Sequence, residues 1–170
     1  HPSVLPEQTL IEPYIDFIAI GAGEYTLLEL VEHLETGATR LEDIKGLVFK
    51  QDGKIIRNEP RPFIEDLDEL PNPAWHLVDV SKHWATSLNT SRGCPFKCTY
   101  CYNTGFHHGY RADLSVSRVI SQIQHLQQNY KVKNIRFFED NFTFNRKRLR
   151  EFCNEVIRLK MKFEWDCEAR

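Results

Sequence analysis

The second half of the chain alternates strand-like and helical patterns of apolar residues. Trp84–Thr90, Asn134–Phe138 and Phe163–Cys167 are runs of strand length that lean apolar. Ser115 lies between the first and second runs, and Asn145 lies between the second and third. Each is placed to cap a helix, and the segment that follows it repeats apolar residues at helical spacing. Strands that alternate with helices in this way predict a right-handed parallel β-α-β-α-β unit.

The first half predicts a shorter α/β segment. Tyr14–Ile20 is a mostly apolar run, as expected for a parallel strand covered on both faces. The glycines of Gly21–Gly23 turn this run into a helix that Gly37 ends, and together they form the unit of a doubly wound sheet. The apolar positions that recur at helical spacing are Leu27, Leu30, Val31 and Leu34. Further on, the Asp52-Gly53 pair between two strand-like runs predicts a β-hairpin.

A proline-rich and acidic stretch separates the two halves. Residues 58–75 contain four prolines and five acidic residues, a composition typical of an extended connector. We therefore expect three parts: residues 1–57, a linker of residues 58–83, and residues 84–170. Three parallel strands leave an open sheet edge, which is a liability in water, and the chain opens on His1 rather than Met. We therefore expect a fragment of a larger protein.

Composition and charge argue against nucleic-acid-binding, membrane and secreted classes of protein. The formal net charge is −2, from 22 basic and 24 acidic residues, so no strong field for nucleic acid or a membrane surface is expected. No apolar run reaches the length of a membrane-spanning helix, and no signal peptide is visible. Five cysteines without a secretory signal predict a reducing, cytoplasmic compartment.

The chemistry of the chain is concentrated in one stretch. Cys94, Cys98 and Cys101 are spaced C-x3-C-x2-C, and three thiolates on one short loop are able to hold three corners of a [4Fe–4S] cluster. Such a set leaves one iron open, where a substrate is able to bind and be reduced. Zinc is the alternative, with His107 or His108 as a fourth ligand. An odd count of cysteines disfavours disulfides, and we expect the remaining two, Cys153 and Cys167, to be buried among apolar residues.

The cysteine stretch resembles the signature of the radical S-adenosylmethionine enzymes, C-x3-C-x-aromatic-C, with Tyr100 in the aromatic position. The resemblance implies a [4Fe–4S] cluster on Cys94, Cys98 and Cys101, and S-adenosylmethionine chelated to the open iron. Reduction then gives methionine and a 5′-deoxyadenosyl radical. It also implies a small-molecule substrate, an electron donor such as flavodoxin or ferredoxin, and the first half of a partial (βα)6 barrel in residues 84–170.

Features outside the cysteine stretch resemble one subgroup of that family. The order G-x-G-E, a helix, a G-L hairpin and then the segment IEDLDELPNPAW is similar to cobalamin-binding members. This resemblance implies that the fold is α/β, with the end of a doubly wound, Rossmann-like cobalamin-binding domain preceding the barrel. It also implies a cobalamin cofactor and methyl transfer or another C–H functionalisation. Some members carry a D-x-H-x-x-G loop that residues 1–170 lack, so no cobalamin ligand is assigned.

The resemblance also implies cofactor contacts beyond the cysteines. Tyr100 occupies the position that faces the adenine of S-adenosylmethionine, and its alternative role is packing against the loop. Glu139 and Asp140 follow the second barrel strand, where the family has a G-G-E that holds an amino group; here the sequence is E-D-N. These carboxylates are predicted to accept hydrogen bonds from an ammonium, or else to favour a helix N-terminus. Glu168 and Arg170 follow the third strand and are further candidates.

Four residues near the cysteines are expected to have no catalytic role. His107, His108 and Arg111 follow the cysteine stretch, and loop histidines are more often solvated than catalytic. Arg92 precedes the stretch and is expected to be solvated.

Two rival functions stay open. One rival is a radical S-adenosylmethionine enzyme that binds no cobalamin. The other is a zinc-stabilised binding module without catalysis.

Overall fold

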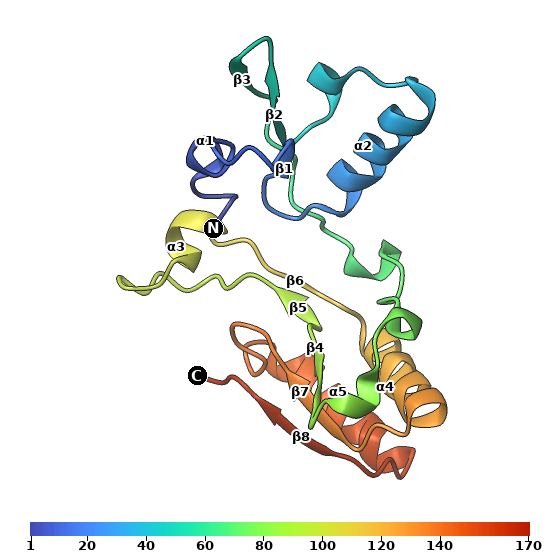
Figure 1. The fold of residues 1–170 in the computed structure, drawn as a ribbon. Coiled ribbons are helices and arrows are strands. Elements are labelled where there is room, and N and C mark those ends of the chain that lie inside the picture. Colours follow the sequence, from blue (N-terminus) through green and yellow to red (C-terminus); the bar gives the residue numbers. More distant parts are fainter. The chain divides into compact units, whose positions relative to one another are not determined.

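A computed structural model describes all residues 1–170, which form two compact units, His1–Ile64 and Glu65–Arg170 (Figure 1). The first unit is a small antiparallel sheet with one long helix, and its strands follow the order β1-β2-β3. Its elements are α1 (Pro6–Thr9), β1 (Phe17–Ala19), α2 (Glu24–Thr36), the 3-10 turn η1 (Leu41–Asp43), β2 (Leu47–Gln51) and β3 (Lys54–Arg57).

Local signals predicted the hairpin and the end of α2 correctly. The hairpin β2–β3 turns at Asp52 and Gly53, whose φ angles are 50° and 75°. Both angles are positive, as a two-residue type I′ turn requires, which explains the Asp-Gly pair. Helix α2 ends at Gly37, which is left-handed with φ 68° and whose N–H donates to the carbonyl oxygen of His33.

The prediction of a parallel strand at Tyr14–Ile20 was wrong. The strand is only Phe17–Ala19, and it pairs antiparallel with β2. An apolar run records burial but does not record which partner strand covers it, and the partner here is a strand of the following hairpin.

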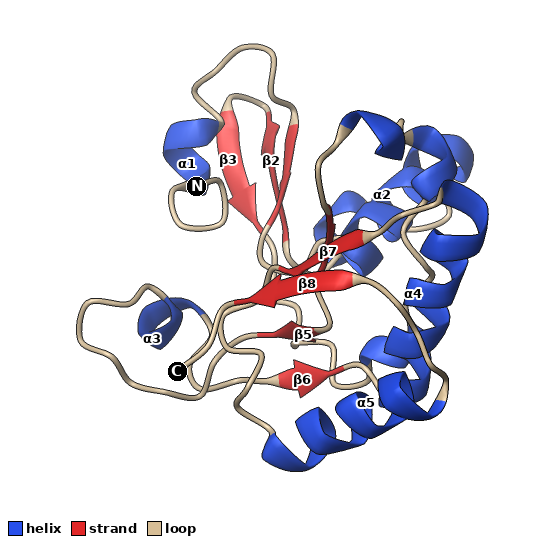
Figure 2. Cartoon of the chain, turned by 90° about the horizontal axis from the view of Figure 1, so that it is seen from below, coloured by secondary structure: helices blue, strands red, loops and turns tan.

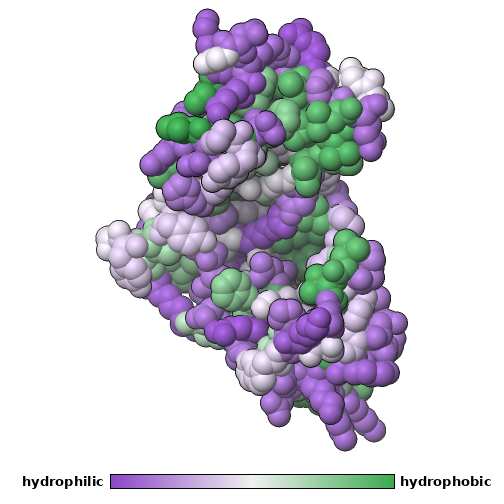
Figure 3. Space-filling model, in the orientation of Figure 1, coloured by the Kyte–Doolittle hydropathy of each residue, from purple (hydrophilic) through white to green (hydrophobic).

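The predicted apolar face of α2 is only partly buried. Leu30 packs in a core with Ile44, Leu47 and Phe49, whereas Leu27 and Leu34 are about three-fifths exposed. Figure 3 shows apolar side chains at the surface over this helix. The predicted helix is therefore confirmed, but the sheet of this unit covers a narrower part of its apolar face than the sequence predicted.

The second unit contains the predicted parallel unit. Its sheet has the order β4-β7-β8 with both pairs parallel, and Figure 2 shows α4 and α5 on the same side of β7 and β8. Its elements are the 3-10 turns η2 (Leu67–Glu69), η3 (Trp75–Leu77) and η4 (Val80–Lys82), then β4 (Thr86–Leu88), β5 (Ser91–Arg92), α3 (Asn103–Phe106), β6 (Ala112–Asp113), α4 (Val116–Tyr130), β7 (Asn134–Phe137), α5 (Arg146–Arg158) and β8 (Glu164–Cys167).

Both predicted helix caps are present. The Ser115 hydroxyl accepts a hydrogen bond from the Arg118 N–H at 3.1 Å, and the Asn145 side chain accepts one from the Arg148 N–H at 3.1 Å. Each cap satisfies one N–H of the first turn, which has no partner inside the helix. The β-α-β-α-β order read from the pattern is therefore confirmed, with shorter strands than the apolar runs.

An aromatic cluster holds the sheet to α5. Phe137 of β7 is fully buried; its ring centroid lies 4.5 Å from that of Phe142 and 5.5 Å from those of Phe152 and Trp165. Aromatic pairs at these distances stabilise a core beyond the area they bury. Cys153 and Cys167 were expected to be buried, but both are half-buried.

Residues 67–72, which belong to the predicted connector, pack on α4. The Asp68 carboxylate accepts from the Ser115 N–H at 3.0 Å, and Arg118 donates to the Leu70 carbonyl at 2.7 Å. Gln122 donates to the Asn72 side chain at 3.2 Å. Hydrogen bonds from α4 and its cap therefore hold in place a segment whose own backbone forms no strand.

None of the helices combines the length and the apolar character needed to cross a membrane.

Replacing Phe137 by Ala is expected to destabilise the second unit by about 3–5 kcal/mol, because a buried ring is lost and a cavity is left. The matched control is Phe138→Ala, since the neighbouring ring is 60% exposed and its loss is expected to cost about 0.5 kcal/mol or less. Denaturant unfolding followed by tryptophan fluorescence measures both. Equal losses in the two variants would contradict the proposed core.

Candidate functional site

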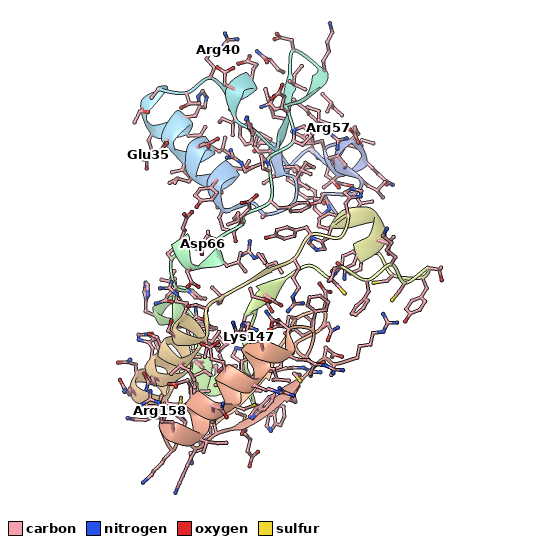
Figure 4. The ribbon with its side chains drawn as sticks, turned by 180° about the vertical axis from the view of Figure 1, so that it is seen from behind. Glu35, Arg40, Arg57, Asp66, Lys147 and Arg158 are labelled. Carbon is pink, nitrogen blue, oxygen red and sulfur yellow. The ribbon has the colours of Figure 1, made fainter.

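Three thiols share one loop beside the carboxyl end of the parallel sheet. Cys94, Cys98 and Cys101 are all free and half-buried. They lie between β5 and β6, which pair antiparallel. Figure 4 draws the side chains of the chain as sticks, seen from behind, with sulfur in yellow. We call residues 93–111 the cysteine loop and the β5–β6 pair the clasp. Because β4 leads directly into β5, the loop follows the first strand of the parallel sheet, where the sequence predicted it.

The cysteine loop begins with a conformation that favours glycine. Gly93 has φ +77°, and a Cβ atom there would lie 2.3 Å from the carbonyl oxygen of Tyr110. A side chain at this position would be strained by its backbone angle and would collide with the other end of the loop. The close approach of Gly93 and Tyr110 is therefore part of how the loop closes.

Two further strand ends reach the cysteine loop. After β7, the Asp140 carboxylate lies beside Tyr102; burial raises the pKa of Tyr102, and the negative charge of Asp140 raises it further. After β8, the Arg170 guanidinium donates to the Cys98 sulfur at 3.4 Å and lies 4.4 Å from the centre of the Phe96 ring. Residues that follow two of the parallel strands thus contact the loop that follows the third.

Glu139 is buried inside the protein rather than exposed at the strand end. Its side chain is 1% exposed. One carboxylate oxygen accepts from the Thr90 N–H at 3.2 Å and from the Thr90 hydroxyl at 2.6 Å, and the other accepts from the Ser91 hydroxyl. The predicted contact with an external ammonium stays a prediction, but in this structure the carboxylate serves donors of the chain itself.

Two arginines that were not predicted as site residues complete the surroundings of Glu139. Arg111 was grouped with solvated loop residues; its side chain is only 6% exposed and lies 2.8 Å from Asp113 and 3.7 Å from Glu139. Arg148 donates to the Thr90 and Leu114 carbonyls at 3.0 and 2.9 Å. A basic first turn in α5, where acidic residues are favoured, is the signal that could have singled out Arg148.

One buried polar atom of the loop has no partner within the chain. Asn103 is 3% exposed, and its side-chain oxygen accepts no hydrogen bond. An unsatisfied buried acceptor costs about 1–3 kcal/mol, and this one follows Cys101 by two residues. Tyr100, by contrast, is 92% exposed. The loop therefore offers an acceptor and an aromatic surface next to its thiols.

The two loop histidines do not complete a zinc site in this structure. The ring of His107 packs edge-on against Phe106 with centroids 4.9 Å apart, and burial lowers the pKa of His107. No group of three or more His, Cys, Asp or Glu side chains is arranged to hold a metal ion. A single ion requires its donors to converge on one point. A cubane does not, because each thiolate binds a different iron atom.

A recess of about 300 Å³ adjoins the clasp within the second unit. Its polar lining includes Ser87, Asn89, Arg92 and Gln122, and leucine, proline and phenylalanine side chains supply the rest. A small volume with few polar groups is typical of sites for small molecules. Arg92, expected to be solvated, is half-buried here.

The comparisons with known proteins agree with the geometry. Residues 88–168 match the sequence model described as Radical SAM superfamily. Over 177 aligned positions, the chain is 36% identical to the uncharacterized methyltransferase PH0819 of Pyrococcus horikoshii, covering all of this chain and 38% of that protein. It is 34% identical to the anaerobic magnesium-protoporphyrin IX monomethyl ester cyclase of Synechocystis, covering 86% of this chain and 30% of that enzyme. The chain thus spans well under half the length of these relatives.

Solved structures show the same fold over nearly all of the chain. The cobalamin-dependent S-adenosylmethionine radical enzyme OxsB, with aqua-cobalamin bound, superposes with a TM-score of 0.81 at 25% identity, covering 99% of this chain and 25% of that one. The radical S-adenosylmethionine methyltransferase TsrM from Kitasatospora setae superposes with a TM-score of 0.74 at 16% identity, covering 94% of this chain and 32% of that one.

Replacing Gly93 by Ala is expected to open the cysteine loop, because the methyl group collides with the Tyr110 carbonyl and a positive φ costs about 1–3 kcal/mol for a residue with a Cβ. Gly105→Ala is the matched control, since a Cβ there meets nothing within 4 Å. Amide hydrogen exchange of residues 94–110 is expected to rise about tenfold or more in the first variant and to stay unchanged in the second. Equal protection in both would show that the close approach does not constrain the loop.

Proposed function

Because the chain belongs to the radical S-adenosylmethionine superfamily, we propose that Cys94, Cys98 and Cys101 bind a [4Fe–4S] cluster that takes part in the reductive cleavage of S-adenosylmethionine. One observation carries the proposal: three free, half-buried thiols lie on a single loop at the carboxyl end of a parallel sheet. Strand-end loops of α/β barrels are where such folds hold their chemistry.

The residues present fit this cofactor. The donors are thiols, which are the usual ligands of iron–sulfur clusters, and all three lie on one loop and are free. When bound, a cluster with one open iron supplies the electron that cleaves S-adenosylmethionine to methionine and a 5′-deoxyadenosyl radical. The chain's own part is to hold the thiols, orient the sulfonium cofactor and limit the access of water.

Three side chains around the loop are proposed to orient the cofactors. Tyr100 offers an exposed ring for the adenine of S-adenosylmethionine. Asp140 is exposed next to the loop and is proposed to accept hydrogen bonds from the amino group. Arg170, beside the Cys98 sulfur, adds positive charge and a hydrogen bond, two of the factors that set cluster potential. Glu139 was predicted to share the role of Asp140 and is treated separately below.

We further propose that the whole protein depends on cobalamin and performs methyl transfer or another C–H functionalisation. The relatives support this, since they include proteins named as methyltransferases and as a cyclase, and a solved neighbour with cobalamin bound. In this proposal, residues 1–57 are the end of the cobalamin-binding domain, residues 58–83 the linker and residues 84–170 the first half of the barrel. The partners are a small-molecule substrate and an electron donor such as flavodoxin or ferredoxin.

Replacing Cys98 by Ala is expected to abolish the cluster, since two thiolates cannot hold three corners. After anaerobic reconstitution of the intact protein, iron and acid-labile sulfide are expected at about four each per chain in the wild type and near zero in the variant, with no 5′-deoxyadenosine formed. Cys153→Ala is the matched control, because Cys153 is also half-buried but lies on α5. Bound zinc without labile sulfide would instead support the zinc-stabilised binding module.

Cobalamin dependence has its own test. The intact protein, produced with cobalamin and purified without oxygen, is expected to retain the cofactor through gel filtration, as shown by its visible absorbance. Methylation or another modification of a substrate is expected to require that fraction. If the protein cleaves S-adenosylmethionine with full activity yet retains no cobalamin, it belongs with family members that work without it.

A further inference from the structure

The cysteine loop is fixed to the rest of the unit through the two strands of the clasp. One strand, Ser91–Arg92, enters the loop, and the other, Ala112–Asp113, leaves it. The residues between them form no strand. Asp140 and Arg170 contact this loop directly, and its two ends are held where the clasp is held. The side chains that hold it come from the end of β7 and the start of α5.

Glu139, after β7, contacts both sides of the clasp. It accepts hydrogen bonds from the backbone and hydroxyl of Thr90 and from the hydroxyl of Ser91 on the entering side. On the leaving side it lies 3.7 Å from Arg111. Hydrogen bonds to a charged acceptor are stronger than neutral ones, so this carboxylate is a strong link between the two sides.

Arg148, in the first turn of α5, makes the same connection, and Asn145, which caps α5, adds a contact on the leaving side. Arg148 donates to the Thr90 hydroxyl at 2.8 Å on the entering side and to the Leu114 carbonyl at 2.9 Å on the leaving side. Asn145 donates to the Asp113 carboxylate at 3.2 Å. Lys147, labelled in Figure 4, marks this turn of α5.

The network pairs opposite charges. Two guanidinium groups, Arg111 and Arg148, face the carboxylates of Asp113 and Glu139. Burial lowers the pKa of Arg148; the charges of Asp113, Glu139 and, more weakly, Asp68 oppose that shift, whereas Arg111 adds to it. Removing one member of a buried set of paired charges leaves an uncompensated charge and destabilises the remaining groups.

We propose that Glu139 is a positioning residue that holds the two sides of the clasp together and thereby sets the spacing of Cys94, Cys98 and Cys101, and that it does not bind S-adenosylmethionine directly. Its side chain is 1% exposed and its oxygens serve donors of the chain, whereas Asp140 beside it is exposed. This inference rests on the proposed function, because the spacing matters for the cluster. It differs from the family resemblance, which implied a direct contact for this carboxylate.

The first test uses the protein without a cluster, so that it does not depend on the cofactor. Glu139→Gln keeps the shape but removes the charge, and Thr90→Val removes one hydroxyl at similar volume. Amide exchange of residues 94–110 is expected to rise about tenfold in the first variant and by a smaller factor in the second. Glu151→Gln, an exposed acid on α5, is expected to change nothing. Unchanged protection in both test variants would overturn the proposal.

The second test uses the reconstituted intact protein. Iron loss to a chelator is expected to be about tenfold faster in Glu139→Gln, as for other residues that orient metal ligands, with an altered electron paramagnetic resonance spectrum of the reduced cluster. The affinity of the loaded fraction for S-adenosylmethionine is expected to change by less than about threefold. The opposite result, normal cluster retention with affinity lowered more than about tenfold, would make Glu139 a direct ligand and overturn the proposal.

A third variant separates positioning from general instability. Ile123→Val removes one methyl group from the fully buried face of α4 and costs about 1 kcal/mol. It is expected to leave the exchange of the loop and the resonance spectrum unchanged; equal effects in Ile123→Val and Glu139→Gln would overturn the proposal. If Glu139→Gln does not fold, Thr90→Val decides the question. If the wild type takes up no cluster, the proposed function fails, and the exchange experiment still shows whether Glu139 holds the loop.

Discussion

The parallel alignment of three strands is the constraint on which the site depends. Leu88, Phe137 and Cys167 are paired across β4, β7 and β8, so the residues that follow each strand emerge at one edge of the sheet. The aromatic cluster around Phe137 fixes that alignment from the helix side. Without this parallel alignment, the segments that carry the thiols, the Glu139-Asp140 pair and Arg170 would not meet at one edge of the sheet.

Much of this arrangement was predictable from the sequence because it is encoded locally. Ser115 and Asn145 indicate where helices begin, because their side chains cap the first turn. Asp52-Gly53 specifies a turn through its backbone, and the spacing of three cysteines restricts the chemistry they can perform. The rule that parallel strands are joined by right-handed crossovers then orders the second unit. Each of these inferences needs only a few neighbouring residues.

The remainder depends on contacts between distant residues, which no local pattern records. The two-residue strands of the clasp are too short to give a periodic signal, and the hydroxyl groups that donate to Glu139 lie 48 and 49 positions away. Arg111 and Arg148 look like surface cations until the fold surrounds them. The direction of β1 was misjudged for the same reason, since an apolar run reveals that a strand is covered but not by what.

Anchoring the cysteine loop at both ends divides the unit into a framework and a replaceable insert. Since the clasp is held by side chains outside residues 94–110, we expect the sheet and its helices to tolerate substitutions within that interval, and even changes in its length. The surface presented to different reactants is thereby able to change while the scaffold keeps its fold.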